Sequence, residues 1–241
     1  MTHPHPHDRH TASRRAGTGG RGPTFPAAVL WDMDGTLVDT EPYWLSAETD
    51  LVRSFGGQWS HEDGLTLVGS GLWHCARILQ GRGVTLSQDE IVDRLTDRVI
   101  DQLTEFGIVW RPGAQELLTE LREASIPTAL VTMSVARMAH HVTGLLGLAA
   151  FDHVVAGDDV THAKPHPEPY LRAAELLGVA VGDCIAIEDS EPGVASAVTA
   201  GAVVIGVPFM VPIAEGSATV LWPTLAGRTL ADLSDLMVSA R

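Results

Sequence analysis

The sequence predicts an α/β protein in which a parallel β-sheet is covered by helices on both faces. Two observations favour this fold. From Arg111 onward, short apolar runs alternate with stretches of helical spacing, as they do in βαβ units. Near the start of the chain, the run from Ala27 to Trp31 has the length and residue types of a buried strand. A long helical stretch separates this strand from the α/β pattern.

The first strand is followed directly by two aspartates, Asp32 and Asp34, and then by Gly35. Side chains two positions apart on an extended chain lie on the same side, so the two carboxylates are expected to repel each other unless a cation or a proton lies between them. Glycine allows the backbone to turn sharply at this point. An Asp-Gly turn alone is common and does not indicate a function, so its interpretation depends on the rest of the chain.

The segment from 42 to 110 is predicted to be all-helical, and residues 1–24 to be a disordered tail rich in His, Pro, Gly and Arg. Glu41 and Pro42 open the first helical pattern, which ends near Gly56. Three more stretches have helical spacing: Thr66 to Val68, Leu72 to Leu79, and Ser87 to Phe106.

Residues 25–41 and 111–241 are predicted to form the α/β core, a three-layer Rossmann-like arrangement. The strands expected after the first one are Pro127 to Thr132, His153 to Ala156, Cys184 to Ile187 and Ala202 to Val207. The helices expected between them are Ala114 to Glu123, Val135 to Leu146, Glu168 to Leu177 and Pro192 to Ala200. If the sheet winds one way through the first three strands and the other way afterwards, the first and fourth strands become neighbours.

Composition excludes several classes of protein. A formal net charge of −14 argues against a nucleic-acid or anionic-membrane surface, and no apolar run is long enough to span a membrane. The two cysteines, Cys75 and Cys184, lie far apart in apolar surroundings, so we expect buried free thiols in a reducing cytoplasm. A monomer or weak dimer is expected.

Lys164 is the only lysine among the 16 basic residues of the chain. Its retention indicates a position where a compact ammonium is needed and a planar guanidinium will not serve. Lys164 follows the third predicted strand, as Thr132 ends the second and Glu188-Asp189 ends the fourth. Ligands of such folds bind beyond the carboxyl ends of the strands, so these side chains are expected to meet Asp32 there.

The stretch Asp32 to Thr40 resembles the first motif of the haloacid dehalogenase superfamily of phosphotransferases, Asp-x-Asp-Gly-Thr followed by an apolar pair and Asp-[Ser/Thr]. The resemblance continues with Thr132 and Ser134, with Lys164 in KPHPEPY, and with Glu188-Asp189-Ser190. It implies that the helical segment is a cap domain, as in the subfamily that includes β-phosphoglucomutase and phosphoglycolate phosphatase.

The resemblance implies a role for each of these residues. Asp32 would be the nucleophile that becomes a phospho-aspartate, and Asp34 the general acid and base. Mg²⁺ would be held by Asp32, the backbone carbonyl of Asp34 and Asp189, with Glu188 as an outer or alternative ligand. The groups expected to hold the phosphoryl oxygens are the Thr132 hydroxyl, the Lys164 ammonium, Ser134, and the backbone amides around Met33 and Met133.

The favoured function is a phosphatase acting on a small phosphomonoester. A sugar phosphomutase is the alternative, although Gly69 to Leu72 lacks the arginine of that subfamily and Thr36 stands where its mutases tend to have Val. A dehalogenase would lack Asp34, and a phosphonate hydrolase would need a lysine in the cap. A receiver domain of two-component signalling would be about half this length, and a silent binding protein usually loses an acidic residue.

Cap residues that could face the site and select the substrate are Trp44, Trp73, His74, Arg77 and Arg98. Packing within the cap is the favoured role for the tryptophans, and a solvated position for the arginines.

Overall fold

The computed structural model describes residues 25–240, so the predicted tail, 1–24, lies outside the described residues. The strands are β1 (Ala28–Trp31), β2 (Thr128–Val131), β3 (His153–Val155), β4 (Cys184–Glu188), β5 (Val203–Gly206) and β6 (Val220–Leu221). The helices are α1 (Glu41–Ser54), α2 (His61–Leu65), α3 (Leu72–Gly81), α4 (Gln88–Phe106), α5 (Ala114–Glu123), α6 (Ala136–Leu145), α7 (Glu168–Leu177), α8 (Glu191–Ala200) and α9 (Leu230–Ser239).

The sheet of the described residues has the order β3-β2-β1-β4-β5-β6, and every neighbouring pair is parallel. The predicted α/β fold is confirmed, including the adjacency of the first and fourth strands. In the register of β1 and β4, Trp31 lies opposite Ile187. Asp32, which follows β1, is therefore brought to the same place on the sheet edge as Glu188, the last residue of β4, and Asp189, which follows it.

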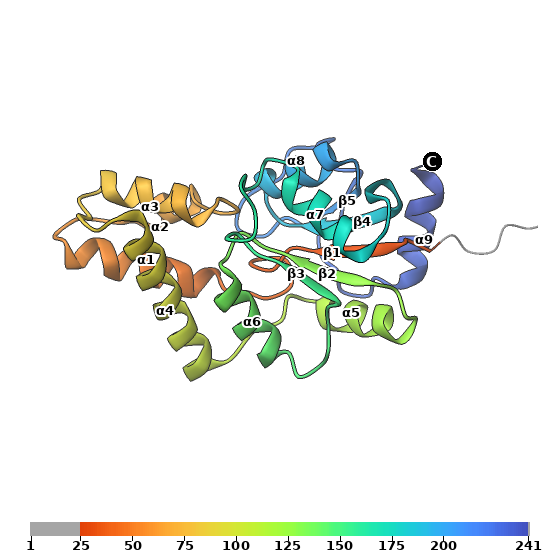
Figure 1. The fold of residues 1–241 in the computed structure, drawn as a ribbon, viewed down its shortest axis with the longest axis horizontal. Helices are drawn as coiled ribbons and strands as arrows, with labels where there is room; N and C mark the ends of the chain where they lie inside the picture. Colours follow the sequence, from red (N-terminus) through yellow and green to blue (C-terminus); the bar gives the residue numbers. More distant parts are fainter. Residues whose placement is uncertain (1–24, 241) are drawn as a thin grey trace, which may run out of the picture.

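Alternation along the strands divides the core into two faces. Val29 and Trp31 of β1 belong to one apolar cluster with side chains of α5, α6 and α9, whereas Ala28 and Leu30 belong to a second cluster with α7 and α8. Successive side chains of a strand point to opposite faces, so β1 contributes to both layers. Figure 1 shows α7 and α8 on one side of the sheet and α5 on the other.

Helices α1 to α4 form a helical segment beyond the carboxyl ends of the strands, at the left of Figure 1. The two chain connections to this segment run side by side: the Asp39 amide donates to the Val109 carbonyl at 2.8 Å, and the Arg111 amide donates to the Leu37 carbonyl at 3.0 Å. The predicted cap boundaries, 42 and 110, lie next to this paired connection, and the division into two domains stays a prediction.

Three parts of the chain differ from the sequence-based expectation. Residues 66–68, predicted to be helical, form turns, and the helix α2 lies just before them. It begins with a reciprocal capping box between Ser60 and Asp63. The elements β6 and α9 were not predicted, although Thr229 and Asp232 form a second capping box at the start of α9.

The predicted free thiols are confirmed, since both cysteines are buried and unpaired.

The C-terminal extension is held against the core at the start of α5. Gly113, the N-cap of α5, has φ +85°, and a Cβ added there would overlap the backbone of Leu225. Further along, the Leu230 amide donates to the Glu120 carboxylate at 3.1 Å. A glycine is therefore required at 113 both for its backbone conformation and for the close approach of another segment.

We expect Gly113→Ala to lower the free energy of unfolding by about 2 kcal/mol or more, because it combines left-handed strain with overlap. Gly144→Ala is the matched control: this residue lies within α6, and nothing lies within 4 Å of an added Cβ. Alanine there should be neutral or stabilise the protein by up to about 1 kcal/mol. Urea unfolding of both variants measures the difference, and equal midpoints would contradict the packing described.

Candidate active site

The candidate site lies at the carboxyl edge of the sheet, where β1 and β4 end side by side. The Asp32 amide donates to the Ile187 carbonyl at 3.1 Å, which fixes the backbone of Asp32 against the end of β4. Asp32, Glu188 and Asp189 are all buried, with carboxylate oxygens within 4.8 Å of one another. The adjacency of two strands therefore gathers three carboxylates in one buried place.

Lys164 lies between two of these carboxylates. Its Nζ donates to Asp32 Oδ1 at 2.7 Å, to Glu188 Oε1 at 2.6 Å and to the Val131 carbonyl at 2.9 Å, and its side chain is 2 % exposed. Burial alone would lower the pKa of Lys164, but the charges of Asp32 and Glu188 raise it above its ordinary value. The ammonium thus stays charged, with three directed hydrogen bonds that a planar guanidinium would not reproduce.

The carboxylates carry more charge than Lys164 balances. Burial, followed by repulsion from Glu188, raises the pKa of Asp32 to about 7, and Lys164 offsets part of this rise. The pKa of Asp189 is also raised, by burial first and then by Asp32 and Glu188. With all three carboxylates ionised, the cluster and Lys164 keep two negative charges in a buried place, which is costly without a counter-cation.

The donor set fits a divalent cation that prefers oxygen ligands. Asp189 Oδ2 is buried and has no hydrogen-bond partner among residues 25–240. An orphaned carboxylate oxygen, beside two more carboxylates, is the environment that a hard cation such as Mg²⁺ occupies in proteins. The observation supports the metal site predicted around Asp32, Glu188 and Asp189.

Two glycines allow these carboxylates to approach the backbone. Gly35 has φ +85°, and a Cβ at this position would overlap the carboxylate of Asp189. A Cβ on Gly193, in the first turn of α8, would overlap the carboxylate of Glu188. The turn predicted at Gly35 is therefore also a place of close packing, because the acidic cluster presses against the loop after β1.

Asp34 has partners of its own, separate from those of Asp32. Its Oδ2 accepts hydrogen bonds from Thr132 Oγ1 at 3.2 Å and Ser134 Oγ at 2.8 Å. Its Oδ1 accepts from Thr40 Oγ1 at 2.5 Å and from the Trp44 indole at 2.9 Å. The side chain is thus held at the entrance to the helical segment, and only its backbone carbonyl remains for the predicted metal.

The favoured role of Trp44, packing within the cap, did not include its contact with Asp34. Trp44 does pack within the helical segment, as expected, and is 8 % exposed. Its indole nitrogen nevertheless reaches the core, because α1 begins next to the paired connections and faces the end of β1. Sequence spacing alone carries no signal for a contact of this kind.

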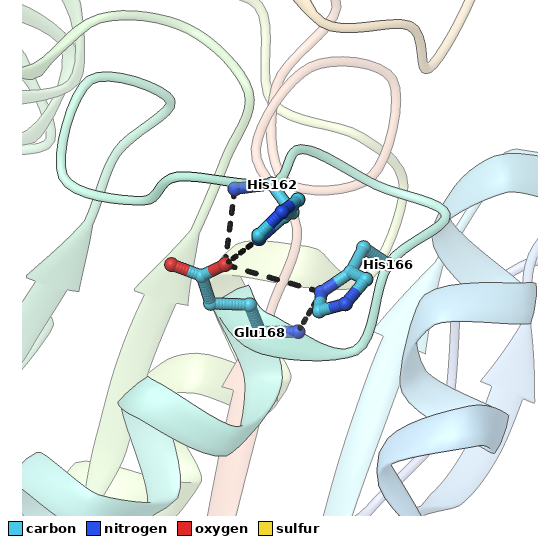
Figure 2. Close-up of side chains that lie close together, drawn as sticks. All are labelled: His162, His166 and Glu168. Carbon is cyan, nitrogen blue, oxygen red and sulfur yellow. Dashed lines mark hydrogen bonds and ion pairs between the residues drawn. The ribbon is translucent and has the colours of Figure 1, made fainter.

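The loop that carries Lys164 is held by Glu168 at the start of α7 (Figure 2). The Glu168 carboxylate accepts hydrogen bonds from the backbone amides of Thr161 at 2.7 Å and His162 at 3.0 Å, and it pairs with His162 Nδ1 at 2.7 Å. The imidazole of His166 lies against that of His162 in a tilted arrangement, with ring centroids 4.5 Å apart. This explains why the motif places an acidic residue four positions after the lysine: the carboxylate closes the loop that delivers the ammonium.

Met33 and Met133, the two methionines of the predicted phosphate site, differ in their surroundings. Met33 is fully buried in the apolar core, whereas Met133 lines the pocket beside the acidic cluster, and its Sδ accepts a hydrogen bond from the Lys164 amide at 3.2 Å. The predicted use of their backbone amides as phosphate ligands stays a prediction.

A pocket of about 340 Å³ opens from Asp32 and Asp34 toward the helical segment. Glu41 and Glu48 of α1 also line it, as does Ser70. Burial raises the pKa of Glu48 to about 7, although the Trp59 indole donates to its Oε2 at 3.0 Å. A carboxyl group with a pKa this far from its ordinary range is typical of functional sites.

The other residues named in the cap lie outside this pocket. Trp73, His74 and Arg77 line a second pocket, of about 640 Å³, between α3 and the loop that precedes Lys164. Arg98 is exposed and pairs with Asp50 at 3.6 Å, in agreement with a solvated position.

The turn from Gly69 to Gly71 connects the helical segment closely with the core. A Cβ on Gly69 would overlap the Ser190 side chain, and a Cβ on Gly71 would lie 2.9 Å from that of Ala163. These glycines are explained by close approach to the loops after β3 and β4. Steric overlap therefore explains why no arginine stands at 69 or 71, since large side chains do not fit at these two positions.

We expect the free energy of unfolding to depend on pH through Glu48. The folded-state pKa of Glu48, about 7, lies above its ordinary value of 4.5, so the folded state binds the proton of Glu48 more tightly than the unfolded state does. The favourable contribution of this proton to the free energy of unfolding is therefore complete below pH 4.5 and is lost as the pH rises through about 7. Glu48→Gln cannot titrate and keeps an acceptor for Trp59, so it should gain up to about 3 kcal/mol on the wild type between pH 5 and 8.

Urea unfolding of the two proteins across this pH range measures the effect. Glu105→Gln, which removes an exposed carboxylate of α4, is the matched control and should parallel the wild type. Parallel curves for Glu48→Gln as well would show that Glu48 titrates normally.

Comparisons with known proteins agree with this geometry. A family model described as haloacid dehalogenase-like hydrolase matches residues 26–201. Hexitol phosphatase A from Escherichia coli is 35 % identical over 184 residues, which cover 74 % of this chain and 81 % of that protein. Fructose-1-phosphate phosphatase YqaB from Escherichia coli is 30 % identical over 177 residues, covering 73 % of this chain and 93 % of that one.

Among solved structures, a CbbY variant from Rhodobacter sphaeroides in complex with xylulose-(1,5)bisphosphate superposes with a TM-score of 0.80 at 28 % identity, covering 86 % of this chain and 99 % of that one. The family model spans most of the chain, and it matches the segment that contains the motifs from Asp32 to Asp189. This chain therefore belongs to the haloacid dehalogenase-like hydrolases, as its sequence motifs indicated.

Proposed function

We propose that this hydrolase is a Mg²⁺-dependent phosphatase that removes the phosphoryl group from a small phosphorylated metabolite, a sugar or sugar alcohol phosphate. The observation that carries the proposal is the buried cluster of Asp32, Lys164, Glu188 and Asp189, of which Asp32 and Lys164 line a pocket. Relatives named as hexitol and fructose-1-phosphate phosphatases support the substrate class.

In the proposed mechanism, Asp32 Oδ attacks phosphorus and forms an acyl phosphate, while the bond from phosphorus to the leaving oxygen breaks. Asp34 gives its proton to that oxygen, so that a neutral alcohol leaves. Asp34 then takes a proton from water, whose oxygen attacks the phosphorus of the phospho-aspartate and restores the Asp32 carboxylate. The hydrogen bonds from Thr132 and Ser134 hold Asp34 in place before substrate binds.

Mg²⁺ would be held by the Asp32 carboxylate, the Asp34 backbone carbonyl and Asp189, with Glu188 nearby, and would neutralise the charge of the transferring group. Lys164 keeps Asp32 oriented through its hydrogen bond and balances part of the same charge. Thr132, Ser134 and the amides around Met33 and Met133 are proposed to hold the phosphoryl oxygens once substrate is bound.

The helical segment is proposed to be a cap domain over the site, with boundaries at 42 and 110. The close approach of its glycine turn to Ser190 and Ala163, and the hydrogen bond from Trp44 to Asp34, support this proposal. Such a cover excludes bulk water while the phosphoryl group is transferred. A phosphomutase would need a cation at the turn 69–72 to hold a second phosphate, and this turn has none.

The partner is proposed to be a small metabolite in the cytoplasm, and neither nucleic acid nor membrane, with a monomer or weak dimer as the working form. The net charge of −14 supports the exclusion of polyanionic partners. None of the helices within residues 25–240 is long and apolar enough to cross a bilayer.

We expect Asp32→Asn to abolish phosphate release from sugar phosphates with Mg²⁺, by roughly a thousandfold or more, because an amide is a poor nucleophile. Released phosphate is the readout, and NMR of the carbon skeleton identifies the product as the free sugar or an isomeric phosphate. Asp101→Asn, on the exposed face of α4, is the control. Phosphate release within tenfold of the wild type would overturn the role of Asp32, and an isomeric phosphate as main product would indicate a mutase.

We expect Lys164→Arg to lower kcat by about a hundredfold, since a larger planar group cannot keep the contacts to Asp32 and Glu188 in the buried space. Arg94→Lys, an exposed exchange of the same two residue types on α4, should have no effect. Full activity of Lys164→Arg would mean that the single lysine has no special function.

A further inference from the structure

The pocket above the catalytic cluster has an acidic wall. Besides Asp32 and Asp34, the carboxyl groups of Glu41 and Glu48 line it, and Lys164 is the one lysine or arginine among its lining residues within the described chain. Lys164 is already engaged by Asp32 and Glu188. The part of the pocket that would receive the organic portion of a substrate therefore offers no free strong cation.

Of the two glutamates, Glu48 is the more deeply buried. It lies on the inner face of α1, is 6 % exposed and is buried against α2 and the residues around Trp59. Within residues 25–240, the Trp59 indole is the one hydrogen-bond donor to its side chain, at 3.0 Å from Oε2. A carboxylate can accept about four hydrogen bonds, so acceptor capacity remains on the side of the pocket.

The burial of Glu48 without a cationic partner needs an explanation. An unpaired buried carboxylate destabilises the fold, and the raised pKa values of Glu48, about 7, and Glu41, about 8, follow from burial first. For Glu41, the charges of Asp34 and Glu48 add to the effect. A carboxyl group that is present although it destabilises the fold is typical of residues that bind a ligand.

We propose that Glu48 is a specificity-determining residue that accepts hydrogen bonds from hydroxyl groups of a neutral polyol or sugar and, with Glu41, rejects substrates with a second anionic group. Hydroxyl donors form strong charge-assisted hydrogen bonds to a carboxylate. A carboxylate or second phosphate at the same place would meet like charge in a confined space. This inference rests on the proposed phosphatase function and deepens it.

The second pocket has the opposite character, because it is lined by basic side chains that could attract a second anionic group. Arg77 and His74 line the second pocket, which shares Ser70 and Lys164 with the first. A second anionic group that reached this pocket would be attracted and not rejected. Turnover of a doubly anionic substrate therefore decides between the two arrangements.

A matched pair of substrates isolates the effect. Sorbitol 6-phosphate and 6-phosphogluconate have the same carbon chain and differ at the far end, where a hydroxymethyl group is replaced by a carboxylate. At pH 9, above the pKa values of both glutamates, we expect the wild type to prefer sorbitol 6-phosphate in kcat/KM by about a hundredfold. Comparable turnover of the two compounds by the wild type would overturn the inference.

Two variants of Glu48 separate its two effects. Glu48→Gln removes the charge but keeps the shape, so the preference should fall about tenfold. Glu48→Asp keeps the charge but withdraws it from the hydroxyls, so KM for sorbitol 6-phosphate should rise about tenfold while 6-phosphogluconate stays rejected. Glu105→Gln should keep the wild-type preference. An unchanged preference in Glu48→Gln and an unchanged KM in Glu48→Asp would each contradict the proposal.

A third substrate distinguishes failure of the inference from failure of the proposed function. p-Nitrophenyl phosphate carries no aliphatic hydroxyl and no second charge, so its hydrolysis reports on phosphoryl transfer alone. If the wild type with Mg²⁺ hydrolyses none of the three compounds, the phosphatase function fails and the inference with it. If p-nitrophenyl phosphate is hydrolysed but Glu48→Gln leaves the preference unchanged, the function stands and the inference is wrong.

Discussion

The site depends on one buried interaction, the ammonium of Lys164 between the carboxylates of Asp32 and Glu188. Parallel pairing of β1 with β4 places these carboxylates side by side, and without the ammonium their repulsion would destabilise the sheet edge. One lysine does not balance three buried carboxylates. The remaining negative charge, with the orphaned oxygen of Asp189, makes this place suited to a cation.

The surrounding loops can be understood as supports of that interaction. Glu168 holds the loop that delivers Lys164, while Gly35 and Gly193 leave room for Asp189 and Glu188. These residues are not proposed to touch a reacting atom, yet each fixes the position of a group in the proposed site. A rigid charge cluster of this kind lowers the cost of reorganisation when charge moves during phosphoryl transfer.

The strands, most helices and the gathering of the charged residues could be predicted because they follow from local patterns and from the topology of parallel sheets. The capping box of Thr229 and Asp232 is also a local signal, and it could have revealed α9. The contact of Trp44 with Asp34 could not have been predicted, since it depends on how the helical segment sits over the core. The same holds for the close approach of Gly69 to Ser190.

The helical segment and the core contribute different electrostatics to one pocket. The core supplies a charge cluster that Lys164 compensates only in part and that is suited to a cation, whereas α1 supplies carboxyl groups without a cationic partner at Glu41 and Glu48. A monophosphate of a neutral polyol matches both parts, because its anionic end meets the cation site and its hydroxyls meet the acceptors. Specificity then depends on the sign of charge along the pocket, and a change of side chain on α1 can alter it while the chemistry at Asp32 stays the same.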